Sequence, residues 1–333
     1  MNISRREFVK VGLSALGGTS LASDLAASGP DALPAVRWGR HEISRLLLGH
    51  NPLKGIAHQA GDLGREMREY FESDPARGRD LMRRCEELGI TTFQLGFRPT
   101  ERFIEDMIRD RLGEGGRFQW IATVYSLPQD REAAERELRS LLQMNPPPIG
   151  MQQVGNTSDL LMRQGKLDLS QDNLKRFRDA GVLVGLGSHN PEVIDYVESR
   201  GWDLDFYQCC FYRSLFGLNP RKDGGESFEL GDREAMIQVI RRVSKPCIAF
   251  KVLAAGRHCQ TAATLEAALR FAFQKIKPTD VVLLGMWQKH KDQAGENIAL
   301  VRKILGSRPP AGPDNRPEAT PSSARPCSAR DRA

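Results

Sequence analysis

The sequence predicts a (β/α)8 TIM barrel of the α/β class. From about residue 44 to residue 305, a short apolar run is followed by a charged amphipathic stretch eight times. Continuous apolar strands that alternate with helices are typical of a parallel sheet that is buried on both faces. Eight such units in about 260 residues fit a closed barrel better than a doubly wound sheet.

The eight predicted strands are the apolar runs of the repeat. They cover residues 45–50, 91–96, 118–125, 149–154, 183–189, 205–211, 247–253 and 281–286. The stretches between them, such as 130–142, place apolar residues three and four positions apart, as an amphipathic helix does. Asp130, Asn190 and Thr264 stand where N-caps are expected. Because a barrel of this type carries its chemistry at the carboxyl ends of the strands, residues there are the first candidates for a site.

Residues 1–28 resemble a twin-arginine signal peptide. Arg5 and Arg6 are followed by Phe8, Lys10 and a short, glycine-interrupted apolar stretch, which gives a basic region, an apolar region and small residues near a cleavage point. The resemblance implies the twin-arginine export machinery as a partner and an extracytoplasmic, for example periplasmic, location. The apolar stretch is too short to favour stable membrane insertion. A helix of the mature fold and a retained anchor are the alternatives.

The rest of the chain is predicted to consist of one barrel domain and a C-terminal tail. Residues 36–305 form the predicted barrel, and residues 307–333, rich in Pro, Ser, Ala and Arg, are predicted to be disordered. The formal net charge is +6, and no basic run concentrates it in the barrel. This distribution argues against nucleic acid as a partner.

Several strand ends, taken in order, resemble the aldo/keto reductase family. The resemblance rests on the segments 36–52, 89–96, 180–194, 205–208, 248–256 and 283–286, with Glu296 and Asn297 further on. It covers the whole predicted barrel, and the ordered set is more specific than any one segment. It implies an oxidoreductase that uses NADP or NAD.

The cofactor half of the family pattern is better preserved than the catalytic half. The residues matched to the nicotinamide and adenine ends are Ser188, Gln208, Phe250, Glu296 and Asn297. Trp287 stands where the family has a basic residue that holds phosphate, and Lys289 or Lys291 is the candidate substitute.

The family's catalytic Asp, Tyr, Lys and His are all replaced in this alignment. Gln94 takes the place of the aspartate, Arg98 lies near the tyrosine position, Val124 stands for the lysine, and the fourth strand, with Gln152, has no histidine. Reduction of a carbonyl needs a proton donor. The comparison therefore predicts weak or absent ordinary reductase turnover.

Three other residues are the candidates for catalysis: Lys251, His50 and Tyr125. Lys251 lies within an apolar run, and lysine is rarely buried without a partner. Directed into the barrel, its amine could polarise a carbonyl or form a Schiff base. An ion pair or an outward-reaching side chain is the alternative. Asn51, Gln94, Gln152 and His189 are predicted to bind substrate, although His189 also fits a helix-capping segment.

The sequence thus predicts an exported aldo/keto-reductase-like protein. Its predicted activity is NAD(P)-linked oxidation or reduction of a carbohydrate or other small carbonyl compound, with non-standard catalytic residues. A carbohydrate lyase or isomerase that uses Lys251, and a non-catalytic barrel that binds a small molecule, are the alternatives. The strand ends carry almost no acids, so neither a metal site nor a paired-carboxylate glycosidase is expected.

Overall fold

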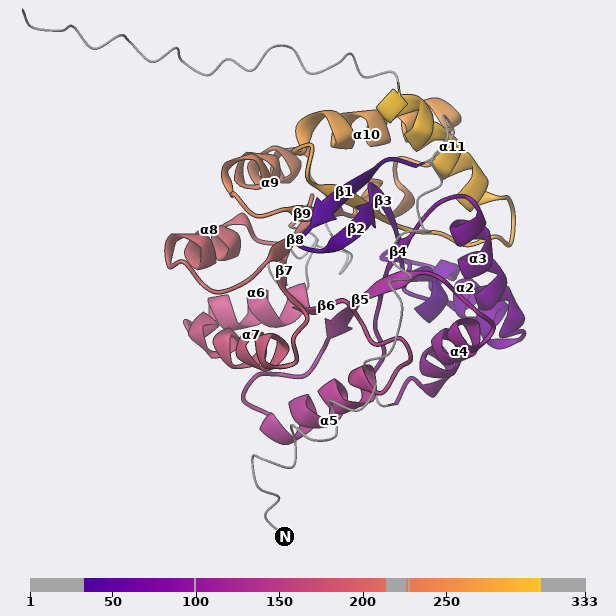
Figure 1. The fold of residues 1–333 in the computed structure, drawn as a ribbon. Coiled ribbons are helices and arrows are strands. Elements are labelled where there is room, and N and C mark those ends of the chain that lie inside the picture. Colours follow the sequence, from indigo (N-terminus) through magenta and orange to yellow (C-terminus); the bar gives the residue numbers. More distant parts are fainter. Residues whose placement is uncertain (1–32, 99, 214–225, 227, 307–333) are drawn as a thin grey trace, which may run out of the picture.

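The computed structural model describes residues 33–98, 100–213, 226 and 228–306 (Figure 1). The predicted signal peptide and the predicted disordered tail lie outside these residues. Within the described part of the chain, no helix is both long enough and apolar enough to cross a membrane.

Eight parallel strands close into a barrel, as predicted. Its strands are β3 (Leu46–Gly49), β4 (Thr92–Leu95), β5 (Gln119–Val124), β6 (Gly150–Gln153), β7 (Leu183–Ser188), β8 (Phe206–Cys210), β9 (Cys247–Phe250) and β10 (Val281–Gly285). Each strand pairs with the next along the chain, and β10 pairs with β3 to complete the circle. All eight strands fall within the predicted runs, so the fold class is confirmed.

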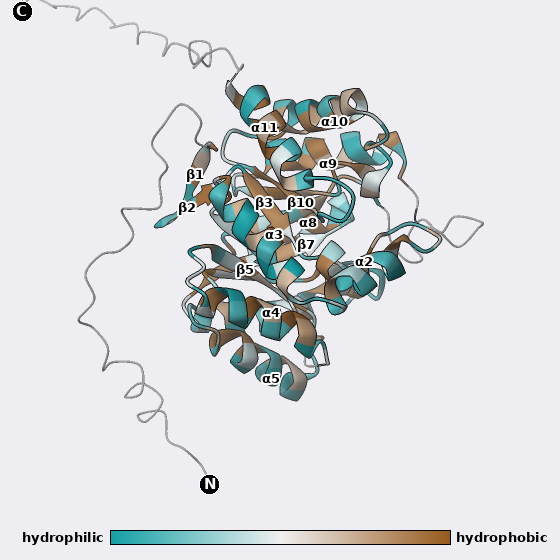
Figure 2. Cartoon of the chain, turned by 90° about the vertical axis from the view of Figure 1, so that its right-hand side faces the viewer, coloured by the Kyte–Doolittle hydropathy of each residue, from teal (hydrophilic) through white to brown (hydrophobic). Residues whose placement is uncertain are grey.

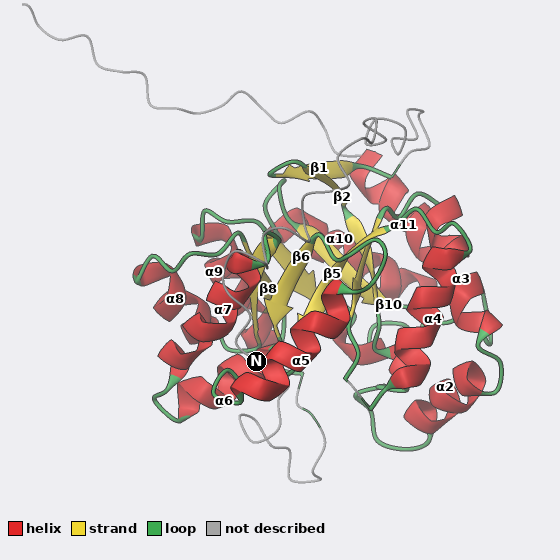
Figure 3. Ribbon diagram, turned by 60° about the horizontal axis from the view of Figure 1, so that its bottom comes forward, coloured by secondary structure: helices red, strands yellow, loops and turns green. Residues whose placement is uncertain are grey.

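Helices surround the barrel and face solvent on their outer sides (Figure 3). They are α2 (Leu63–Glu72), α3 (Ala76–Glu87), α4 (Arg102–Gly113), α5 (Arg131–Leu142), α6 (Gly155–Arg163), α7 (Ser170–Asp179), α8 (Pro191–Ser199), α9 (Leu230–Arg242), α10 (Ala262–Lys275) and α11 (Gln293–Gly306), with short 3-10 turns at Pro52–Lys54, Leu167–Leu169 and Ala254–Gly256. Asp130 and Asn190 are N-caps, as predicted. The prediction for Thr264 was wrong by one turn: Thr261 caps α10, and Thr264 completes a capping box with it.

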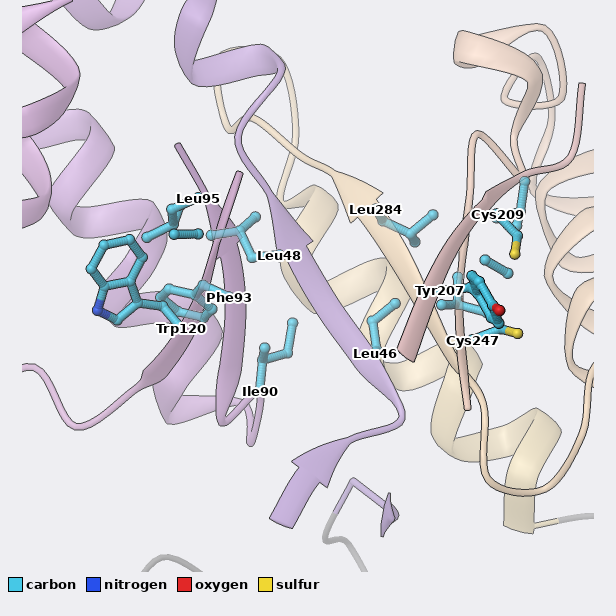
Figure 4. Packing of buried hydrophobic residues seen from close by; sticks show 14 of the residues in the cluster. Leu46, Leu48, Ile90, Phe93, Leu95, Trp120, Tyr207, Cys209, Cys247 and Leu284 are labelled. Carbon is cyan, nitrogen blue, oxygen red and sulfur yellow. The ribbon is translucent and has the colours of Figure 1, made fainter. Parts of the chain in front are cut away.

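The alternation of side chains along the strands makes two apolar layers. Leu46 and Leu48 point outward and pack with Trp120, Tyr207 and other residues beneath the helices (Figure 4). Leu47, between them, belongs to a separate cluster inside the barrel. Figure 2 shows mostly brown, hydrophobic strands in the middle of the molecule and helices in which teal and brown residues alternate.

A β-hairpin closes the amino end of the barrel. Its strands β1 (Ala35–Trp38) and β2 (His41–Ser44) pair antiparallel, and they lie across the middle of the ring in Figure 1. Trp38 stacks on Phe206 inside the barrel, with ring centroids 5.5 Å apart. Gly185 on the neighbouring strand leaves room for the Phe206 ring, because a Cβ there would lie 2.2 Å from its Cζ atom. The opposite end is left for a site.

Candidate functional site

A cavity of about 1110 Å³ opens at the carboxyl ends of the strands. Eleven of the residues predicted for a site line it: His50, Asn51, Gln94, Tyr125, Gln152, His189, Gln208, Phe250, Lys251, Glu296 and Asn297. Ser188 is not among the described lining residues, because its buried hydroxyl donates instead to Asp159 at 2.5 Å. Barrel topology therefore gathers nearly all of the predicted residues in one place.

Tyr125 is the centre of a partly buried acid–base cluster, which we call the tyrosine cluster: Tyr125, His50, Lys54 and Glu101. The Tyr125 hydroxyl lies 2.8 Å from His50 Nε2, and Lys54 Nζ donates to the same hydroxyl at 3.0 Å. Lys54 also pairs with Glu101 at 2.7 Å, and its side chain is 2% exposed. A tyrosine, a lysine and a histidine thus lie together here, although none of them aligns with the catalytic residue of the same type in the aldo/keto reductase pattern.

Hydrogen bonds determine the protonation states within the tyrosine cluster. His50 Nδ1 donates to the carbonyl oxygen of Gln94 at 3.1 Å, which leaves Nε2 to accept from the Tyr125 hydroxyl. Burial, with the nearby charge of Lys54, lowers the pKa of His50 to about 3, so its imidazole is neutral at physiological pH. Burial raises the pKa of Tyr125. The phenol therefore remains protonated and can act as a donor.

Local backbone structure holds the two key side chains. Both oxygens of Glu137 accept backbone N–H groups directly after β5, from Tyr125 and Ser126, each at 2.8 Å. Lys54 ends a 3-10 turn that Pro52 begins, and Gly55 follows in the left-handed conformation at φ 67°. A Cβ on Gly55 would lie 2.6 Å from the Gly64 carbonyl oxygen, so the turn that positions Lys54 requires glycine.

Sequence reasoning missed Lys54 and Glu101. A signal for Lys54 was present: it follows His50 by four residues, with Pro52 between them, and that spacing places two side chains on one face of a helical turn. Glu101 carried no such signal, since it lies just before α4 and reaches Lys54 only through the fold.

Uncharged amides form the floor of the cavity. Gln94 and Gln152 both donate to the Thr123 hydroxyl, from the strands on either side of β5. The Oε1 atoms of Gln152 and Gln208 are buried and have no hydrogen-bond partner within the described residues. Because an unpaired buried acceptor is costly, each oxygen is suited to accept a hydrogen bond from water or from a ligand that donates N–H or O–H.

His189 lines the cavity and is backed by a buried carboxylate. Its Nδ1 donates to Asp159 at 2.9 Å, and its backbone N–H donates to the same carboxylate at 3.2 Å. Asp159 comes from α6 and is 2% exposed. Asn190, rather than His189, caps the following helix, so the capping alternative for His189 does not apply.

Lys251 lines the cavity and is held there by an ion pair. Its Nζ pairs with Glu226 at 2.8 Å, and the Lys251 side chain is 6% exposed. Glu226 also accepts from His58 Nδ1 at 2.7 Å, and Asn51 donates to His58 Nε2 at 3.0 Å. Burial alone would raise the pKa of Glu226, but its bonds to His58 and Lys251 lower it to about 2. An ammonium held by a carboxylate is not the free amine that a Schiff base needs.

Apart from Ser188, which ends β7, the predicted cofactor residues lie on the β8–β10 side. Phe250 packs edge-on against His189, with ring centroids 5.2 Å apart, and Gln208 presents its unpaired Oε1 nearby on β8. At the far rim, Glu296 pairs with Lys291 at 2.6 Å. Lys291 lines the cavity, whereas Lys289 pairs with Glu66 on α2. Of the two candidate phosphate ligands, Lys291 is therefore the better placed.

Nowhere in the ranges that the structure describes do three His, Cys, Asp or Glu side chains gather as a metal site requires.

Comparison with known proteins identifies the fold. A protein from Pseudomonas aeruginosa assigned to the aldo-keto reductases has a TM-score of 0.57 and 17% identity, over 83% of this chain and 97% of that one. An aldo-keto reductase from Bacillus halodurans, in its holo form, has a TM-score of 0.53 and 15% identity, over 82% and 95%. A single-site variant of Gox0644 in complex with NADPH has a TM-score of 0.52 and 12% identity, over 86% and 99%.

The fold is that of these aldo-keto reductases. No family model matches the chain, and no curated protein matches it. At such low identity the likeness shows the fold alone, so a function has to be argued from the site.

Proposed function

We propose that this protein is an NADP- or NAD-linked oxidoreductase that reduces a small hydroxylated carbonyl compound, with Tyr125 as the proton donor. The observation that carries the proposal is the Tyr125 hydroxyl, which is held between Lys54 Nζ and His50 Nε2 inside the cavity. It supplies the proton donor that the sequence comparison did not find.

The tyrosine cluster provides each step that the protein itself must perform. A bound nicotinamide would supply the hydride. Tyr125 then donates its proton to the carbonyl oxygen of the substrate, and the Lys54 ammonium stabilises the phenolate that forms. Glu101, whose side chain is 26% exposed, links Lys54 to solvent and gives a route for the returning proton. The amide floor, with Gln152 Oε1 unpaired, fits the hydroxyl groups of a substrate.

The cavity also fits the cofactor. The unpaired Oε1 of Gln208 is an acceptor suited to the amide N–H2 of a nicotinamide, and the Phe250 ring offers a surface for stacking. The basic side chains of Lys251, Arg257 and Lys291 lie along the lining and can contact phosphate groups, although Lys251 and Lys291 are each paired with a carboxylate that also lines the cavity. The NADPH complex of the Gox0644 variant shows that a barrel of this shape holds such a dinucleotide.

Calorimetry with NADPH tests the cofactor assignment. Lys251→Met is expected to weaken NADPH binding by roughly 10- to 100-fold, because a hydrogen bond to a charged group contributes about 1.5–3 kcal/mol. Lys289→Met is the matched control: Lys289 lies outside the described lining and should leave the affinity unchanged. Absence of binding of both NADPH and NADH to the wild type would contradict the assignment.

Two other functions have less support. A lyase or isomerase that uses Lys251 as an amine conflicts with its ion pair to Glu226. A non-catalytic binding barrel gives no role to the contact between the Tyr125 phenol and the Lys54 ammonium.

We also propose export by the twin-arginine route, which is supported by Arg5 and Arg6 and by the apolar stretch that follows them. Replacing both arginines by lysine should leave the full-length precursor inside the cell, because the export machinery recognises the two arginines themselves. Cell fractionation with N-terminal sequencing measures the outcome. Unchanged export of the double variant would exclude the route.

A further inference from the structure

We propose that His189, oriented by Asp159, is a general base that removes a proton from the carbon next to a substrate carbonyl. The cavity would then interconvert α-hydroxy aldehydes and α-hydroxy ketones through an enediol, with no net redox change. This activity goes beyond the reductase reaction, but it rests on the same assignment of Tyr125 as a proton donor.

The first support is the state of the His189 ring. A carboxylate only accepts hydrogen bonds, so the contact of 2.9 Å between Nδ1 and Asp159 places the ring proton on Nδ1. Nε2 therefore carries the free lone pair, and it has no hydrogen-bond partner among the residues that the structure describes. Since His189 lines the cavity, this lone pair is available to a ligand.

The second support is the environment of Asp159. It accepts from the Ser188 hydroxyl at 2.5 Å and from both the backbone and the ring of His189. No Lys or Arg side chain in the described ranges pairs with it. A buried carboxylate without a cation is energetically costly. If His189 only made hydrogen bonds to a ligand, it would not need a carboxylate beside it. In this position a carboxylate fixes the orientation of an imidazole base and stabilises the imidazolium that forms when the base takes a proton.

The third support is close packing around the ring. The α6 helix begins at Gly155, and a Cβ there would lie 3.0 Å from both Cε1 and Nδ1 of His189. On its other side, the ring meets Phe250 edge-on. The imidazole is therefore held in one orientation, as a base aimed at one substrate atom must be.

The arrangement of the strands puts an acid opposite this base. Tyr125 follows β5 and His189 follows β7, so their strands are about 10 Å apart, given a strand spacing of about 4.8 Å. Both side chains line the same cavity, and a substrate of a few carbon atoms fits between them. The β6 strand between them carries Gln152, whose unpaired Oε1 can accept the substrate hydroxyl.

The proposed step balances without a cofactor. His189 Nε2 takes the proton from the hydroxyl-bearing carbon, and the electron pair of that C–H bond forms the carbon–carbon double bond. The carbonyl π electrons move to oxygen, which takes the Tyr125 proton and gives an enediol. In the return step, the other hydroxyl gives its proton to the Tyr125 phenolate, and the former carbonyl carbon takes the proton held by His189.

Hydrogen–deuterium exchange in D2O, without any nicotinamide, tests the proposal. Dihydroxyacetone, glyceraldehyde and hydroxyacetone are the probes, and NMR follows deuterium entering the carbon next to the carbonyl. The wild type should catalyse exchange, and His189→Gln should lower the rate by about 10²-fold or more, since a general base contributes about 10²–10⁴-fold. The exposed His290 supplies a control, His290→Gln, which should leave the rate unchanged.

NADPH affinity separates the base from a cofactor ligand. Glutamine keeps a hydrogen-bonding amide near the position of Nε2, so His189→Gln should bind NADPH within about twofold of the wild type. The proposal is overturned if the wild type exchanges none of the probes, or if His189→Gln exchanges normally. Exchange without cofactor binding would refute only the reductase proposal, and reduction without exchange would refute only this one.

Asp159→Asn tests the positioning residue through the pH profile. The exchange rate should fall at acid pH as Nε2 becomes protonated. Burial lowers the pKa of His189 and Lys251 lowers it further, whereas Asp159 and Glu226 raise it. Loss of the Asp159 charge should therefore move the acid limb to lower pH and reduce the maximal rate by about tenfold or more. An unmoved acid limb would show that Asp159 has only a structural role.

Discussion

Tyr125→Phe is expected to lower kcat/KM for carbonyl reduction by about 10²–10⁴-fold, the usual contribution of a general acid. The substitution removes only the hydroxyl that contacts Lys54 Nζ and His50 Nε2. NADPH affinity should not change, because the residues assigned to the cofactor lie on the β8–β10 side of the cavity. Steady-state rates with a panel of small hydroxylated carbonyl compounds, together with calorimetry, measure both quantities.

Tyr196→Phe is the matched control for this variant. Its hydroxyl is at the surface and donates to Asp168, so removing it should leave the rate unchanged. If Tyr125→Phe reduces carbonyl compounds as fast as the wild type, Tyr125 is not the proton donor. Lys54→Met, which keeps Tyr125, would then be the next variant to measure. If Lys54 itself donates the proton, this variant should lose the reductase activity that Tyr125→Phe retains.

Phe206→Ala is expected to lower the free energy of unfolding by about 3–5 kcal/mol, the usual cost of truncating a buried phenylalanine. Phe206 is fully buried inside the barrel, stacks on Trp38 of the hairpin and fills the space that Gly185 leaves. Urea denaturation followed by tryptophan fluorescence would report both the overall loss and the changed surroundings of Trp38.

A surface truncation provides the comparison for this loss. Leu230 is 58% exposed, so Leu230→Ala should change the free energy of unfolding by no more than about 0.5 kcal/mol. Equal stability of the Phe206 and Leu230 variants would mean that the hairpin and the barrel interior do not stabilise each other as the packing indicates.

The fold could be predicted because its signal is local and repeated. Each barrel strand is a short apolar run between amphipathic stretches, and glycines such as Gly89 and Gly181 end helices with positive φ. The N-cap of α10 was misplaced from Thr261 to Thr264, since two threonines three residues apart both fit a cap and the structure uses both. Patterns of this kind predict that a helix or strand is present more reliably than they predict the residue at which it begins.

The site could be predicted only as a set of strand ends. The topology rule placed His50, Tyr125 and His189 in one cavity, but the partners of these residues come from distant segments. His50 and Tyr125 are 75 residues apart, and Asp159 and His189 are 30 apart. An alignment to a family compares residues strand by strand. It therefore gave no signal for Lys54, which lies in the turn after the first barrel strand.

The closed amino end of the barrel has a kinetic consequence. With the hairpin packed under the strands through Trp38, the proposed dinucleotide and substrate would both have to enter at the carboxyl ends of the strands. The side chains of Lys291 and Glu296, which are proposed to contact the dinucleotide, are about half exposed, whereas Tyr125, the proposed acid, is partly buried between Lys54 and His50. The dinucleotide, bound along the cavity lining, should thus bind first and dissociate last. Product-inhibition patterns should then show a compulsory order of addition.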